Sequence, residues 1–75
     1  MTTPALRRIV LDFEAAALRA VAAGDASDVE QAHEAAIERF RDVKDSCEAD
    51  GHLEAFYRAV IEVDLKLKMA LEAVR

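Results

Sequence analysis

Apolar residues between positions 53 and 74 recur at alternating steps of three and four, and this spacing allows few structures other than a helix. They are Leu53, Phe56, Val60, Val63, Leu67, Ala70 and Val74. A strand is the alternative, because apolar residues also alternate with polar or small ones from 61 to 71. A lone strand would have no partner within the chain, so it would pair with its copy in an oligomer. We favour the helix, since leucine, lysine, methionine, glutamate and alanine prefer it.

A second apolar row, spaced by four residues, falls on nearly the opposite side of the same predicted helix. It consists of Tyr57, Ile61, Leu65 and Met69, and charged residues border it. In one interpretation the third helix lies centrally and the other two helices cover both of its sides. In the other, the second row contacts another molecule, because so short a chain covers two rows with difficulty. Leu11 and Leu18 form a weaker row on the back of the first helix, and we expect all six residues to form a protein interface.

Capping signals divide the rest of the chain into two further helices. Pro4 suits the first turn of a helix, and Gly24 suits the left-handed residue that ends one. Ser27 and Glu30 have the spacing of a capping box, which predicts that the second helix begins at 28. Gly51 then marks its end in the same way as Gly24.

Short turns between the predicted helices make consecutive helices antiparallel. The sequence therefore predicts one all-α domain over residues 1–75 that associates with itself. We favour an antiparallel three-helix bundle, and the alternative is a long hairpin with the first helix laid across it. The predicted helices cover residues 4–23, 28–49 and 52–74.

The net charge of -5 is concentrated in the middle of the chain. Residues 25–50 hold nine acidic and three basic residues, a balance of -6. Five of the acids share one side of the second helix: Glu30, Glu34, Glu38, Asp42 and Asp45. This side is either a solvated face that keeps the protein in solution or a docking face for a basic partner. Direct binding to nucleic acid is not expected, because it needs clustered lysine and arginine.

Candidate metal and catalytic groups are sparse. Glu30 and His33 have the spacing used in di-iron helical bundles, but the motif has no second copy. Cys47 and His52 flank the second turn, and a lone pair of this kind is weak evidence for zinc. The sequence has no glycine-rich phosphate loop and no nucleophile elbow. We therefore expect no catalytic activity, no cofactor and no metal.

These patterns favour a small non-enzymatic module for protein–protein interaction: an adaptor, a chaperone-like subunit or a regulatory subunit. It would use the apolar second face of its last helix, with a second copy of the chain as the expected partner. The alternative is a small acidic inhibitor that docks on a basic site of a larger enzyme or nucleic-acid-binding complex. A single cysteine, which cannot form an internal disulfide, and the lack of a long apolar run predict a cytoplasmic protein that does not enter membranes.

Overall fold

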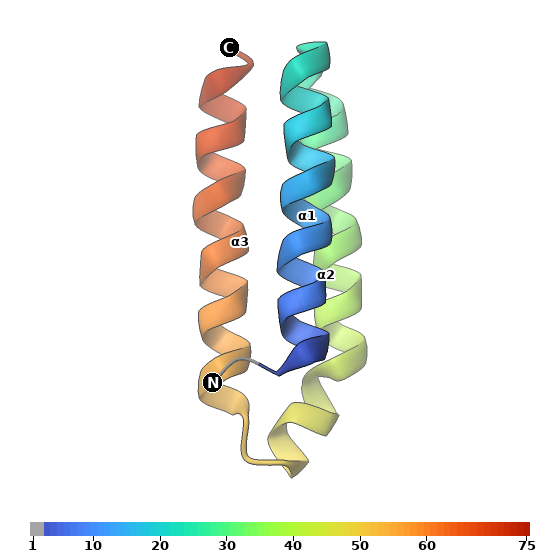
Figure 1. Ribbon diagram of the computed structural model, residues 1–75, viewed down its shortest axis with the longest axis vertical. Helices are drawn as coiled ribbons and strands as arrows, with labels where there is room; N and C mark the ends of the chain where they lie inside the picture. The colour runs from blue at the N-terminus through green and yellow to red at the C-terminus, as the bar shows by residue number, and fades with distance from the viewer. Residues whose placement is uncertain (1–2) are drawn as a thin grey trace.

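Three helices of similar length lie side by side in an elongated bundle (Figure 1). The computed structural model describes residues 3–75, and its principal extents are 40 × 17 × 14 Å. The helices are α1 (Pro4–Ala23), α2 (Ala26–Ala49) and α3 (Leu53–Ala73). Because each turn reverses the chain, α2 is antiparallel to both neighbours, and α1 and α3 run in the same direction. Each helix contacts the other two, which confirms the all-α three-helix bundle. The strand alternative is wrong, since residues 61–71 lie within α3.

Both turns are closed by the same backbone device, in which a glycine takes the left-handed conformation. Gly24 has a φ of 68° and Gly51 a φ of 75°. In the first turn the N–H of Gly24 donates to the carbonyl of Val21, and the N–H of Asp25 donates to that of Ala20, both over 3.0 Å. This pair of bonds is the Schellman motif, which satisfies carbonyls that the end of a helix leaves free. The second turn repeats the pattern, so the sequence-based helix ends at 23 and 49 are confirmed.

The start of α2 differs from the expectation. Asp25 is the N-cap, and its carboxylate accepts a hydrogen bond from the backbone N–H of Asp28 over 3.2 Å. The predicted capping box of Ser27 and Glu30 is wrong, because both residues lie inside the helix. The physical reason is the tightness of the first turn. Asp25 completes the closure of α1 and already has extended backbone angles, so the next helix can begin at Ala26.

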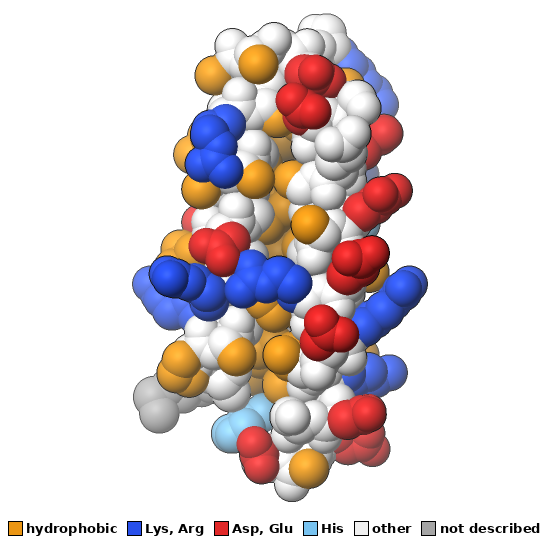
Figure 2. Space-filling view, turned by 90° about the vertical axis from the view of Figure 1, so that its right-hand side faces the viewer, with side chains coloured by type: hydrophobic (Ala, Val, Ile, Leu, Met, Phe, Trp, Pro, Cys, Tyr) orange, Lys and Arg blue, Asp and Glu red, His pale blue; other side chains and the backbone are white. Residues whose placement is uncertain are grey.

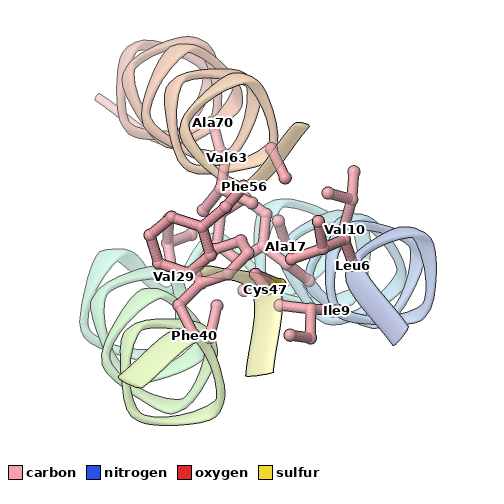
Figure 3. Close-up of a cluster of buried hydrophobic side chains, with 14 residues drawn as sticks. Leu6, Ile9, Val10, Ala17, Val29, Phe40, Cys47, Phe56, Val63 and Ala70 are labelled. Carbon is pink, nitrogen blue, oxygen red and sulfur yellow. The ribbon is translucent and has the colours of Figure 1, made fainter. Parts of the chain in front are cut away.

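The core runs along the axis of the bundle and receives side chains from all three helices (Figure 3). Within the core, the ring of Phe40 of α2 packs edge to face against the ring of Phe56 of α3, with ring centroids 5.7 Å apart. Valine and alanine fill most of the remaining length, and small side chains allow the helices to approach closely. The buried residues are Leu6, Ile9, Val10, Phe13, Ala17, Ala20, Val29, Ala36, Phe40, Cys47, Phe56, Ala59, Val63 and Ala70.

Candidate protein-binding surfaces

Six large apolar side chains remain exposed within residues 3–75, and they are the six that the sequence singled out. Their exposed fractions run from 42% at Leu11 to 71% at Leu18. We call the set the apolar face; it consists of Leu11, Leu18, Tyr57, Ile61, Leu65 and Met69. On α3, Ile61 is 57% and Leu65 59% exposed. The interpretation in which α1 and α2 cover both sides of α3 is therefore wrong for the single chain.

Helix geometry explains why the bundle leaves this row uncovered. Val63 is wholly buried, while Ile61, two positions earlier, lies about 200° away around the helix axis. Two neighbouring helices cover the side of α3 that faces the centre of the bundle. The side that faces away has no covering element in a three-helix bundle. A row that a fourth element would bury is therefore left exposed.

The row on α3 reaches a groove that it shares with α1. Each step of four residues overshoots a helical turn by about 40°, so the row drifts around α3 as it ascends. At its upper end Met69 lies across from Leu18 of α1, and the two line an open groove of about 420 Å³. Ala17 and Ala70 also line it, and their small side chains leave the space. The groove, here called the α1–α3 groove, joins the two apolar rows, which were predicted separately and on different helices.

An ion pair between α1 and α3 forms part of the lining of the same groove. The Lys66 ammonium of α3 contacts the Glu14 carboxylate of α1. The hydrogen bond to Glu14 raises the pKa of Lys66 above its ordinary value of 10.5; partial burial opposes this, and the charges of Glu14 and Glu62 add to it. Leu11 lies beside Arg58 and Glu62. The apolar face is thus bordered by charges of both signs.

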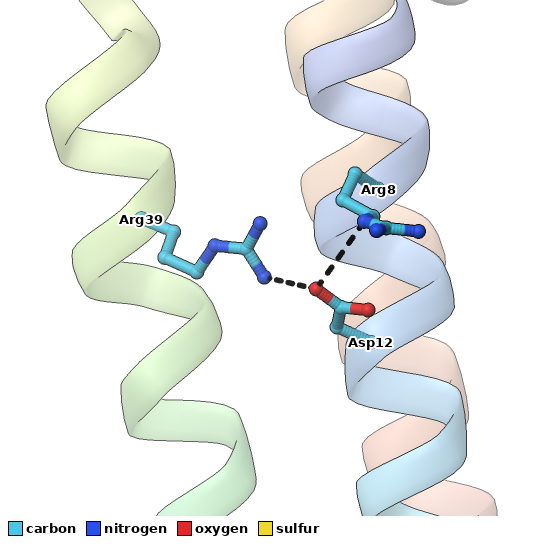
Figure 4. A network of polar contacts seen from close by, with 3 residues as sticks. All are labelled: Arg8, Asp12 and Arg39. Carbon is cyan, nitrogen blue, oxygen red and sulfur yellow. Dashed lines mark hydrogen bonds and ion pairs between the residues drawn. The ribbon is translucent and has the colours of Figure 1, made fainter.

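The acidic residues predicted on α2 form a ridge, a row of separate acidic groups along the bundle (Figure 2). All five are exposed: Glu30, Glu34, Glu38, Asp42 and Asp45. Within residues 3–75 none of them belongs to an ion pair. Arg39 of α2 turns away from the ridge and donates to Asp12 of α1 over 2.7 Å, next to Arg8 (Figure 4). The negative charge of the ridge therefore faces solvent without a partner within the described chain.

Two of the candidate metal ligands, His33 and Cys47, are held by contacts within the bundle. His33 approaches Asp64 of α3, with Nε2 and Oδ1 3.0 Å apart, and packs edge-on against Phe13. Cys47 is buried in the core, where a thiol acts as a small apolar group. The part of the chain from 3 to 75 contains no group of three or more histidine, cysteine or acidic side chains placed to hold a metal ion. The contact between His33 and Asp64 was not predicted, because the two residues are 31 positions apart.

Known proteins give no guide to the function of this chain. Comparison with protein-family models, curated proteins and solved structures finds no match. In the described residues, no helix combines the length and the apolar character needed to cross a membrane. The apolar face and the acidic ridge are the two candidate binding surfaces of the described chain.

Proposed function

We propose that this chain is a small non-enzymatic module that binds another protein through its apolar face. The observation that carries the proposal is the exposure of six large apolar side chains on α1 and α3, with Leu18 and Met69 brought together at one groove. Scattered apolar residues are ordinary on a protein surface, whereas large apolar residues that share a groove with a charged border are typical of protein interfaces. The groove lining, which is apolar except for Glu14 and Lys66, supports contact rather than catalysis. The single cysteine supports a reducing compartment such as the cytoplasm.

The energy available from the apolar face is large enough to hold a partner. Complete burial of one large apolar side chain yields about 1.5–3 kcal/mol. Because these six are 42–71% exposed, covering them all would yield roughly 5–10 kcal/mol as an upper bound. Association costs about 4–15 kcal/mol in lost freedom of motion. A partner must therefore add apolar surface of its own, which favours a protein with a matching apolar patch.

Recovery of partners from a native extract tests this function. Tagged parent chain is compared with Leu65→Lys and with a matched control, Glu34→Gln, which raises the net charge by the same single unit on the opposite surface. Both positions are exposed, so both variants should keep the helical circular dichroism of the parent. We expect Leu65→Lys to lose the bound proteins and Glu34→Gln to retain them. Retention by both variants would reject the apolar face as the binding surface.

The acidic ridge supports a second candidate function, that of an inhibitor docked on a basic site of an enzyme or nucleic-acid-binding complex. Its five carboxylates have no basic partner within the described chain, and like charges at steps of four cost about 0.2–0.5 kcal/mol each in an isolated helix. An inhibitor of this kind predicts the reverse result, with binding lost in a Glu34→Gln/Glu38→Gln variant. It also predicts a steep fall in partner binding between low and moderate salt, because exposed charges are screened over about 8–10 Å.

A further inference from the structure

We infer that the partner of the apolar face is a second copy of this chain, in a symmetric dimer joined through the side of the bundle formed by α1 and α3. The inference rests on the proposed function and names the partner of that same face. Three properties of the molecule support it: the area of this side, the presence of the same apolar face on both copies, and the distribution of charge among the helices.

The area of this side is close to what a stable dimer needs. A specific interface buries about 800 Å² on each partner, roughly one sixth of the 5138 Å² surface of this chain. One long side of a bundle 40 Å long and 14–17 Å wide has a flat projection of roughly 600 Å², which its ridges and the α1–α3 groove enlarge. A contact that used this side fully would bury an area at the lower end of the range found in stable protein–protein interfaces.

A second copy also supplies the matching surface that any partner must bring. In a two-fold dimer the same patch is used on both subunits, so the part of each apolar face around Leu18 and Met69 is covered by its counterpart. The covered apolar surface is then twice that of one chain, without any other protein being required. The groove beside Met69 and Leu18 offers space for side chains that project from the other copy.

The charge distribution favours this side over the others for self-association. Helix α1 carries three arginines, one aspartate and one glutamate, and residues 51–75 carry four bases and four acids, which gives +1 for the two together. The segment that contains α2 carries -6. A dimer joined through α2 would bring two strongly negative segments together, and like charges brought together oppose association. Joining α1 and α3 leaves both acidic ridges outside.

Sedimentation equilibrium of the purified chain, alone in solution, tests the dimer. We expect the mass to double from 8.3 kDa as the protein concentration rises. Leu65→Lys and Leu18→Lys should each raise the dimer dissociation constant about 100-fold or more, since each would bury a lysine in an apolar contact. Glu34→Gln, remote from the contact, should change it by less than about threefold.

The outcomes separate this inference from the proposed function. A parent chain that keeps a mass of 8.3 kDa at about millimolar concentration would overturn the dimer. A dissociation constant of about that concentration already corresponds to a binding free energy near the weak limit of specific binding. Unchanged self-association in both lysine variants would also overturn it. If the parent is monomeric but Leu65→Lys still loses its proteins from the extract, the apolar face binds a different protein and the proposed function stands. If neither lysine substitution changes self-association or the recovery of proteins from the extract, both the dimer and the proposed function are rejected.

Discussion

Truncation of Val63 and of Ile61, two residues apart on α3, should change the stability of the fold by very different amounts. Val63 is wholly buried, so Val63→Ala removes two methyl groups from the core. Their transfer accounts for about 1.6 kcal/mol, at roughly 0.8 kcal/mol per carbon, and the cavity adds to this. The better helix propensity of alanine returns about 0.5 kcal/mol. The expected net loss is about 1.5 kcal/mol, or roughly 6–12 °C in melting temperature for a domain of this size.

Ile61→Ala removes more carbon from the same helix, yet most of that side chain is already in water. With 57% of Ile61 exposed, only the remaining part has buried surface to lose. That loss is about 1 kcal/mol and alanine's helix propensity offsets about half of it. We therefore expect a change within about 0.5 kcal/mol for the isolated chain, as for most surface substitutions.

Thermal unfolding followed by circular dichroism at two protein concentrations measures both effects. At a few micromolar, Val63→Ala should melt well below the parent and Ile61→Ala close to it. At a concentration about 100-fold higher, association raises the melting temperature of the parent. Ile61→Ala should lose that increase, because the substitution removes apolar area from the dimer contact. If Ile61→Ala were as damaging as Val63→Ala at low concentration, the outer side of α3 would be buried in the monomer, and the argument for the apolar face would fail.

Two further predictions concern the helix start and the interhelical ion pair. Asp25→Ala should lower the free energy of unfolding in urea by about 1 kcal/mol and Ser27→Ala by only a few tenths, since Asp25 provides the cap of α2. Equal effects of the two substitutions would show that Ser27 caps the helix as the sequence predicted. Raising the pH should remove the contribution of Lys66, whose pKa lies above 10.5 in the folded chain because of Glu14. That stabilisation is complete below pH 10.5 and disappears as the pH rises through the raised pKa, and Glu14→Gln should flatten this alkaline loss in a series of melting temperatures.

Local rules predicted the helices because the information they need lies within a few residues. The spacing of Phe56, Val63 and Ala70 predicted the buried side of α3. The row containing Ile61 and Leu65 allowed two interpretations, and its exposure in the structure decides between them. The ends of α1 and α2 were also predicted from their glycines, because few other residues adopt the left-handed conformation. The error at the start of α2 arose where two caps compete, since Asp25 and Ser27 both have a side chain suited to the position.

Contacts between helices could not be predicted in the same way. Three helices joined by short turns can close with the third on either side of the first two, and periodicity does not distinguish the two arrangements. That choice decides that Lys66 meets Glu14 and that His33 meets Asp64. It also decides that Leu18 and Met69 share one groove. The sequence identified the residues of the apolar face, whereas only the packing shows that the rows on α1 and α3 join.

The separation of charge from apolar surface limits how this protein can assemble. The ridge on α2 is almost opposite to the core side of its own helix, while the apolar face belongs to α1 and α3. If two copies join through α1 and α3, the two ridges lie on the far sides of bundles that are each 14–17 Å wide. That separation exceeds the screening length of about 8 Å at physiological salt, so the ridges would hardly repel each other. A dimer would therefore leave both acidic ridges free, and a basic partner bound there would not compete with self-association.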